Sequence, residues 1–168
     1  MTRPNSADAD GVFEPFPIAE VPWQTHEKGA RFGMRFQVLS EFGGGSQITV
    51  AMEILEPGRQ ANPLHYHLLE EEHVFVLEGS MTVILGEQRH IVEAGHYACF
   101  PAGQKVGHAL LNHTDAPCRY LVLGNPNKHD VAVFPETGRV SVRLAGESYL
   151  TTPNPDYWDG IDIDTPAA

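Results

Sequence analysis

The histidines and glutamates between residues 63 and 79 are the side chains of this sequence best suited to chemistry. The segment PLHYHLLEEEHVFVLEG places three histidines and three consecutive glutamates in an otherwise apolar stretch, where charge is costly to bury without a partner. In a strand, His65 and His67 project from the same side, about 7 Å apart along the backbone, so their imidazoles could converge on one ion. Several first-row transition metals accept imidazole nitrogen, commonly with a carboxylate. The alternative is a pair of solvent-facing histidines.

Composition narrows the class of protein. With 168 residues, 42% apolar and 20% charged, the chain is expected to fold as one globular domain. Its formal charge is −11 and no run of Lys and Arg exceeds a pair, which argues against nucleic-acid binding. No apolar run is long enough to span a membrane, and MTRPNSADADGVFEP lacks the apolar core of a signal peptide. We therefore expect a cytoplasmic protein that binds neither nucleic acid nor membrane.

Histidine is over-represented relative to cysteine. The chain has nine histidines and only two cysteines, Cys99 and Cys118, which are too few for a disulfide framework. We expect both cysteines to pack as small apolar residues. Histidine is the commonest metal ligand and titrates near neutral pH, so the histidine positions carry most of the functional information.

The elements that must position these residues are short strands. Turn signals recur from Gly43-Gly44-Gly45 onward, and the intervening segments are rich in β-branched and aromatic residues: QITVAMEIL, HVFVLEG, MTVIL, RHIVEA, HYACF, RYLVLG and RVSVRL. This pattern predicts an all-β sandwich or barrel. A helix over residues 64–77 competes, because LLEEE is good helix-forming sequence. The β-rich run 73–77, which leads directly into a Gly-Ser turn, favours a strand.

Two motifs within this pattern resemble a known family. His65, His67, Glu72 and Gly79, with four residues between His67 and Glu72 and six between Glu72 and Gly79, resemble the first conserved motif of the cupin superfamily. After a further 15 residues, GHYACFPAG and the downstream His108 are similar to the second cupin motif. The loop before His108 is longer than in the family pattern, a departure that affects the approach loop rather than the histidine itself.

The resemblance implies a fold and a metal site. The fold is a double-stranded β-helix, the cupin or jelly-roll barrel, and the resemblance extends over residues 46–124. It also implies one divalent transition metal ion, which is iron, manganese, zinc or nickel. The residues that match the family's metal ligands are His65, His67, Glu72 and His108.

We expect three parts along the chain. Residues 1–22 form an extended or partly disordered arm, 23–146 form the barrel domain, and 147–168 form a tail that packs on the barrel. The tail contains Tyr149, Tyr157 and Trp158, aromatics that either dock it or cover a pocket mouth.

Other polar residues beside the motifs receive different interpretations. We expect Glu70 and Glu71 to be solvated charges in a turn, and His73 to lie at a surface or interface, since strand parity places it opposite Glu72. His96, where the family usually has aspartate, is expected at the surface. Asn112 shares a strand face with His108, and we favour a hydrogen bond to its own turn over contact with the pocket.

The predicted site supports several functions. Three neutral imidazoles, one carboxylate and a divalent ion sum to a charge of about +1, which favours an anionic or enolisable oxygen ligand. We favour a metalloenzyme of dioxygenase, oxidase or Lewis-acid type that acts on a small polar metabolite, with no catalytic residue assigned beyond the ligands.

The alternative from another class is a non-catalytic module in which the metal holds a ligand or stiffens the barrel. A sugar isomerase or epimerase is a minor alternative, because none of Arg59, Lys105 and Arg119 can be placed in the barrel. The resemblance also implies a homodimer.

Overall fold

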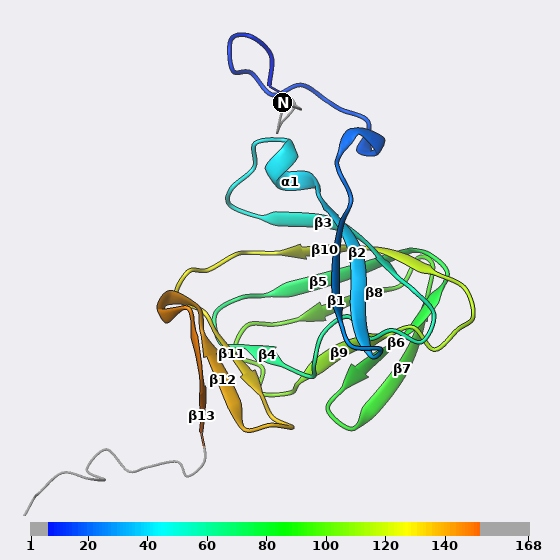
Figure 1. The fold of residues 1–168 in the computed structure, drawn as a ribbon, viewed down its shortest axis with the longest axis vertical. Helices are drawn as coiled ribbons and strands as arrows, with labels where there is room; N and C mark the ends of the chain where they lie inside the picture. Colours follow the sequence, from blue (N-terminus) through cyan, green and yellow to red (C-terminus); the bar gives the residue numbers. More distant parts are fainter. Residues whose placement is uncertain (1–6, 152–168) are drawn as a thin grey trace, which may run out of the picture.

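The chain folds into three antiparallel sheets that wrap around a common interior (Figure 1). The computed structural model describes residues 7–151. The sheets have the strand orders β1-β2-β3-β10-β5-β8, β7-β6-β9 and β13-β12-β11-β4. The strands are β1 (Gln24–Lys28), β2 (Phe32–Val38), β3 (Thr49–Leu55), β4 (Tyr66–His67), β5 (Glu72–Glu78), β6 (Ser80–Leu85), β7 (Gln88–Glu93), β8 (Tyr97–Phe100), β9 (His108–Leu111), β10 (Cys118–Gly124), β11 (Val131–Phe134), β12 (Arg139–Val142) and β13 (Glu147–Leu150).

Helical structure is confined to single turns in the described residues. One four-residue helix, α1 (Leu39–Phe42), follows β2, and two 3-10 turns occur at Ile18–Glu20 and Arg143–Ala145. No helix in the described part of the chain is long and apolar enough to cross a lipid bilayer. The prediction of an all-β jelly-roll barrel is confirmed. The competing helix over residues 64–77 is wrong, because this stretch contains β4, an irregular turn and β5.

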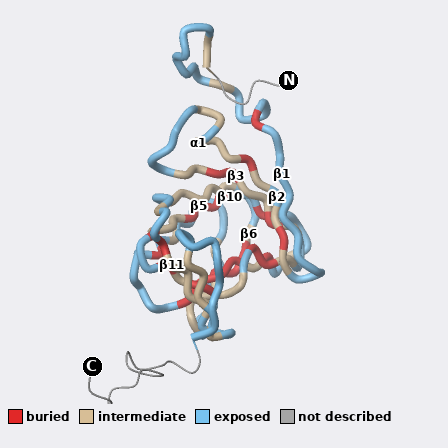
Figure 2. Tube along the Cα trace, turned by 60° about the vertical axis from the view of Figure 1, so that its left-hand side comes forward, coloured by how far each residue is buried: buried red, intermediate tan, exposed pale blue. Residues whose placement is uncertain are grey.

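The core is formed by inward-facing residues of the six-stranded and the three-stranded sheet. Alternation of side chains along β3, β5, β6 and β10 buries an apolar cluster whose largest members include Leu55, Val76, Met81 and Tyr120. Figure 2 shows these buried positions inside the barrel, while the segment that precedes β1 is mostly exposed. The core therefore fixes the register of the strands that carry the histidines and glutamates.

The described termini extend from this barrel. The segment before β1 projects from one end of the molecule, as Figure 1 shows. Residues 147–150 of the expected tail form β13, which pairs with β12 at a sheet edge, and Tyr149 there is exposed. Tyr157 and Trp158 lie outside the described residues, and the proposed domain boundaries stay a prediction.

One cysteine prediction is wrong. Cys118 is fully buried in the apolar core, as expected, but Cys99 is exposed on the outer face of β8. Side chains alternate between the two faces of β8. Phe100 therefore points into the core, and the neighbouring Cys99 points outward.

Candidate metal centre

Backbone pairing brings the first and last of the four predicted ligands together. His65 and His108 exchange two backbone hydrogen bonds, with N···O distances of 3.1 and 2.7 Å, although 43 positions separate them in the sequence. Residues opposite each other in an antiparallel pair point to the same side, so both imidazoles enter the barrel. Their ring centroids are 4.6 Å apart, and both residues are buried.

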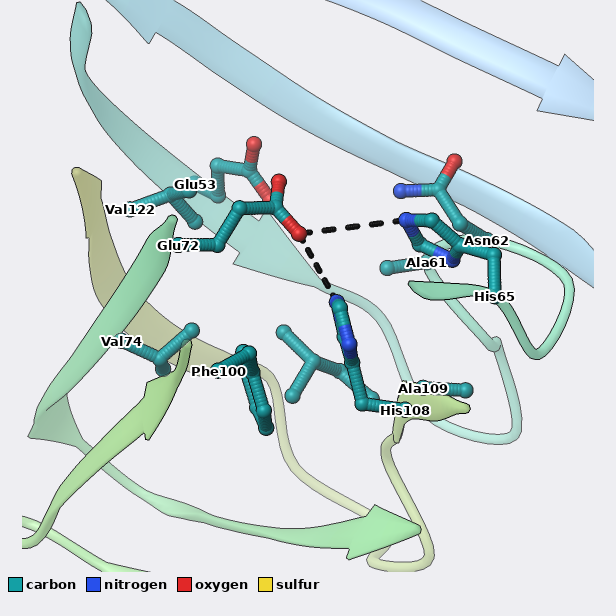
Figure 3. Close-up of a pocket in the computed structure, with 11 residues that line it drawn as sticks. Glu53, Ala61, Asn62, His65, Glu72, Val74, Phe100, His108, Ala109 and Val122 are labelled. Carbon is teal, nitrogen blue, oxygen red and sulfur yellow. Dashed lines mark hydrogen bonds and ion pairs between the residues drawn. The ribbon is translucent and has the colours of Figure 1, made fainter. Parts of the chain in front are cut away.

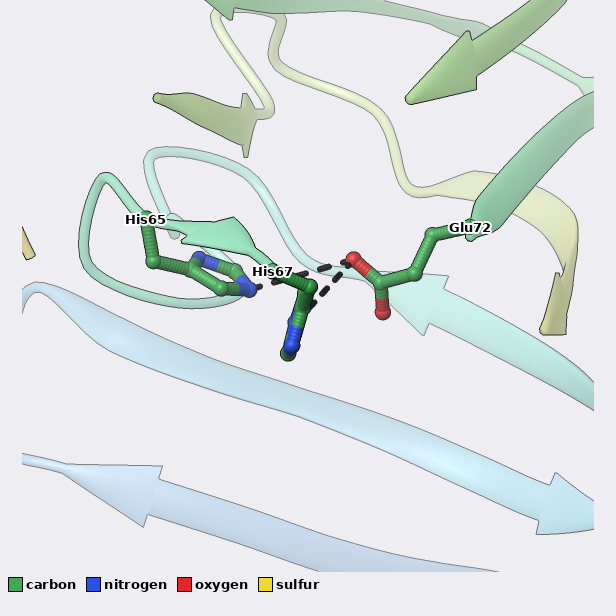
Figure 4. A group of neighbouring side chains, drawn as sticks. All are labelled: His65, His67 and Glu72. Atoms are coloured by element: carbon green, nitrogen blue, oxygen red, sulfur yellow. Dashed lines mark ion pairs between the residues drawn. The ribbon is translucent and has the colours of Figure 1, made fainter. Parts of the chain in front are cut away.

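The other two predicted ligands complete the cluster from β4 and β5. His67 is two residues after His65 and its ring lies 5.0 Å from that of His65. Glu72 is the first residue of β5, and Figure 4 shows its carboxylate directed toward the two histidines. One ligand atom from each of His65, His67 and Glu72 lies within 4.8 Å of the others.

A single carboxylate oxygen is close to all three imidazoles. Glu72 Oε2 is 2.8 Å from Nε2 of His108, 3.6 Å from Nε2 of His67 and 3.8 Å from Nε2 of His65. The hydrogen bond to His108 and the ion pair to His65 are drawn in Figure 3. Ligands of one ion at about 2.1 Å lie about 3 to 4 Å from each other, so these separations fit a shared transition metal ion.

Groups behind the rings orient two of the imidazoles. His65 Nδ1 is 2.8 Å from the carbonyl of Pro63, which can only accept, so Nδ1 donates and Nε2 keeps its lone pair toward the site. His67 Nδ1 is 2.5 Å from Asp130 Oδ2 and donates to it in the same way. Such outer partners fix the tautomer that binds a metal. The donor set therefore fits a divalent ion in chemistry as well as in spacing.

The protonation states also suit a metal ligand set. Burial and the neighbouring His108 lower the pKa of His65 to about 4, so this imidazole is neutral at physiological pH. Burial alone would raise the pKa of Glu72, but the hydrogen bond from His108 and the charges of the histidines lower it to about 2. The site thus presents a neutral imidazole and an ionised carboxylate near pH 7.

Comparisons with known proteins place this architecture in a family. A family model described as a cupin domain matches residues 51–124. A solved structure of a sugar phosphate isomerase from a cupin superfamily, from Silicibacter pomeroyi, is 30% identical, has a TM-score of 0.66, and covers 75% of this chain and 82% of that chain. The chain belongs to the cupin superfamily.

Two further relatives differ in described activity. A candidate sugar phosphate isomerase from Acidithiobacillus ferrooxidans is 25% identical with a TM-score of 0.66, and the match covers 70% of this cupin and 74% of that chain. Quercetin 2,3-dioxygenase from Bacillus subtilis (strain 168) is 30% identical over 101 residues, which is 58% of this chain. The match covers only 30% of that curated relative's length.

The cupin barrel holds a small cavity at the cluster. Its volume is about 60 Å³, enough for a few water molecules, and its lining includes His65, Glu72 and His108. Phe100 stacks on His108 with ring centroids 3.9 Å apart and planes 4° from parallel. A neighbouring hollow of about 210 Å³ shares Glu72 and Val122 with this cavity.

Glu53 is a functional candidate that the sequence analysis missed. It lines the same cavity from β3 (Figure 3), and its carboxylate accepts a 2.8 Å hydrogen bond from the Tyr120 hydroxyl. Burial raises the pKa of Glu53 to about 7, the Tyr120 hydrogen bond opposes this shift, and the charge of Glu72 adds to it. The sequence does contain a feature that could have identified Glu53. It is a glutamate within the apolar run TVAMEIL, on the same strand face as Ala51 and Leu55.

The prediction that Glu70 is a solvated turn charge is wrong. Glu70 is buried and pairs with Arg143 of the turn after β12, with Nη2 to Oε2 at 2.7 Å. Its backbone N–H and that of Leu69 donate to Asp130, the carboxylate that holds His67. Sequence reasoning could not find Asp130 or Arg143, because both lie 60 or more residues from their partners.

The remaining predictions beside the motifs agree with the structure. Asn112 is fully buried and hydrogen-bonds its own turn, where it accepts from Thr114 and donates to Ala116. His96 is exposed, and His73 points away from Glu72 on the outer face of the sheet. Of the three basic residues considered, none lines the cavity: Arg59 bonds backbone carbonyls and Arg119 pairs with Glu78.

Proposed function

We propose that this cupin is a divalent-metal-dependent enzyme that acts on a small polar or anionic metabolite. The observation that carries the proposal is the convergence of Nε2 atoms of His65, His67 and His108 on one oxygen of Glu72, at 2.8 to 3.8 Å. These four residues would hold iron, manganese, zinc or nickel. An ion bound there would supply Lewis acidity toward a substrate oxygen or, if redox-active, electrons for oxygen chemistry.

Residues of the chain itself would handle the substrate proton. Glu53 lies in the same cavity with a pKa of about 7, which is suited to taking a proton from a substrate hydroxyl or acidic C–H and returning it later. Tyr120 holds this carboxylate by its hydroxyl. Val74 and Phe100 line the cavity with apolar surface that limits water near the reacting groups.

Oxygen-dependent chemistry is favoured over sugar phosphate isomerisation. Four protein ligands leave two positions on an octahedral ion, enough for a bidentate substrate or for substrate and dioxygen. A sugar phosphate needs a cation for its phosphate, but no Arg or Lys of the described residues lines the cavity. Arg143 lines the neighbouring hollow and is already paired with Glu70. We therefore base the choice between the two reactions on the residues that line the cavity, and not on similarity to the dioxygenase or to the isomerase.

The second candidate is non-catalytic binding of a small ligand. The modest cavity, about 60 Å³, favours this function, because it admits only a few atoms next to the ion without side-chain movement. A large chelator-dependent change in thermal stability without turnover would support it.

Oxygen uptake tests the proposal. The protein is loaded anaerobically with iron, or with manganese or nickel in parallel, and screened against small acids, diols and phenols. We expect uptake with one substrate class, and loss of uptake in the Glu53→Gln variant at unchanged metal content. Metal-loaded protein that shows no turnover with any metal across the screen would contradict the catalytic proposal and leave the binding candidate.

We also propose a cytoplasmic homodimer, which fractionation and sedimentation test separately.

A further inference from the structure

A second group of ligand-type side chains lies on the outer face of the barrel wall. Side chains alternate along the segment that enters β5, so Glu71 and His73 point outward while Glu72 points inward. His73 pairs directly with Cys99 of β8 in the antiparallel register. Directly paired residues place their side chains next to each other on one face. Strand register thus gathers a carboxylate, an imidazole and a thiol outside the barrel.

The distances suit one shared ion. One ligand atom from each of Glu71, His73 and Cys99 lies within 4.8 Å of the other two. His73 Nε2 is 3.0 Å from Glu71 Oε1, a separation typical of two ligands on the same metal. The side chain of Glu71 is 45% exposed and that of His73 is 26% exposed, so an ion from solvent can reach them.

Tyr97 orients the imidazole for this role. Its hydroxyl lies 2.5 Å from His73 Nδ1, and the two rings stack with centroids 5.8 Å apart. With Nδ1 engaged by Tyr97, Nε2 is directed at Glu71 and is the nitrogen available to a metal. A tyrosine hydroxyl can accept from Nδ1–H as well as donate to Nδ1, so this contact is compatible with the tautomer that leaves Nε2 free to bind a metal.

The group opens onto a hollow. Glu71, His73 and Tyr97 line a surface depression of about 610 Å³, together with the apolar side chains of Ile48 and Leu123. Three protein ligands would leave a fourth position on a tetrahedral ion, and the hollow beside Glu71 and His73 has room for an exchangeable ligand. Zinc sites with one exchangeable position likewise use three protein ligands drawn from Cys, His and carboxylate side chains.

We propose that Glu71, His73 and Cys99 form a second divalent-metal site, selective for zinc over the hard ions, with one exchangeable position toward the hollow. A thiolate ligand selects zinc over magnesium, calcium and manganese. When zinc binds, the S–H bond is replaced by an S–Zn bond and the proton is released to solvent. The site is independent of the barrel centre, since it uses the opposite sheet face and none of the four barrel residues.

Thiol reactivity provides the test, because Cys118 is fully buried and only Cys99 is accessible. The rate of alkylation of the full chain by iodoacetamide is measured with and without zinc. We expect zinc to slow alkylation at least about tenfold, with recovery on chelation. Magnesium should give no protection. An unchanged rate in zinc would overturn the proposal.

Matched variants separate the proposed site from a stray zinc contact. His73→Gln and Glu71→Gln should lose the protection, whereas His90→Gln, at an exposed position on β7, should keep it. Protection that survives in His73→Gln and Glu71→Gln would overturn the assignment. The double variant His65→Ala/His108→Ala should retain protection, which separates this site from the barrel centre and from the proposed function.

Cobalt gives a readout that does not depend on alkylation. Cobalt-loaded wild-type protein should show a thiolate-to-cobalt charge-transfer band in the near ultraviolet, and Cys99→Ser should lose it and bind one equivalent fewer. A band of unchanged intensity in Cys99→Ser would contradict the ligand role of this thiol.

Discussion

Glu53 is a partly buried carboxylic acid that lies close to a second carboxyl group. Its carboxyl shares a cavity with Glu72, and burial raises its pKa from 4.5 to about 7. A raised pKa means that the folded protein binds the proton more tightly than the unfolded chain. The resulting contribution to stability is fully present below about pH 4.5 and is lost as the pH rises through about 7.

The Glu53→Gln variant tests this linkage in metal-free protein. The amide keeps an oxygen for the Tyr120 hydroxyl but cannot ionise, so the variant should gain stability over the wild type between pH 4.5 and 8. The gain is at most about 3 kcal/mol, which is the free energy that corresponds to a pKa shift from 4.5 to about 7. Urea unfolding across this pH range measures it, with Glu87→Gln in an exposed turn as control. An equal effect at both ends of the range would refute the raised pKa.

Asp130 determines which nitrogen of His67 carries a proton. Its Oδ1 accepts from the backbone of Leu69 and Glu70, and its Oδ2 accepts from His67. In Asp130→Asn, the amide oxygen is retained by the backbone donors and the NH₂ group faces His67. His67 Nδ1 must then accept, which leaves the proton on Nε2, where a metal would bind.

We therefore expect Asp130→Asn to weaken metal affinity about 10- to 100-fold while the fold is retained. Isothermal titration measures the affinity, and circular dichroism checks the fold. Asp115→Asn, at an exposed turn position, is the matched control and should bind like the wild type. Equal metal affinity in Asp130→Asn and the wild type would show that Asp130 does not position His67 for metal binding.

Strand parity explains which residues of the site were predictable. Local alternation is enough to turn Glu72 inward and His73 outward, and the motif spacing singles out Glu72 from its two neighbours. The partners of Glu70 and His67 lie on the segment around β11 and β12, and no local pattern carries that information. Glu53 was detectable in principle, since a lone acid on the inner face of an apolar strand needs an explanation.

At the scale of elements, the turn at Gly79 sets the geometry between β5 and β6. Gly79 has φ of +81°, and an added Cβ would lie 2.8 Å from the carbonyl oxygen of Pro117. Gly95 has φ of +89° with no atom within 4 Å of an added Cβ. Both glycines therefore have a left-handed backbone conformation, but only at Gly79 would an added Cβ clash with a neighbouring backbone atom.

Gly79→Ala should destabilise the barrel more than Gly95→Ala. The left-handed conformation alone costs about 1–2 kcal/mol for alanine, and Gly79→Ala must also displace the backbone before β10. We expect the difference between the two variants to exceed about 1 kcal/mol in urea unfolding. Equal destabilisation would show that the contact with Pro117 has no energetic role.

The strands themselves were predictable where the apolar alternation is long. The runs that form β3, β5, β6 and β10 were identified from sequence because each buries one face against the core. β4 has only two residues, His67 and Tyr66, and its pairing with β11 depends on tertiary contacts. The exposure of Cys99 was missed because β8 is short and its phase is set by the burial of Phe100.

At the scale of the molecule, the acidic chain surrounds a site whose bound form would carry a positive charge. A homodimer is a prediction of the family resemblance. Sedimentation equilibrium should give twice the mass of the chain, independent of metal at the barrel centre. A concentration-independent monomer would contradict it.

The central claim is that His65, His67, Glu72 and His108 hold one divalent ion inside the barrel. Elemental analysis of protein purified without a metal-binding tag, in the Cys99→Ser background to remove the outer site, tests it most directly. We predict about one equivalent of transition metal per chain, and near-complete loss when His65→Ala and His108→Ala are introduced. A full equivalent, bound with undiminished affinity, in those histidine variants would contradict the account.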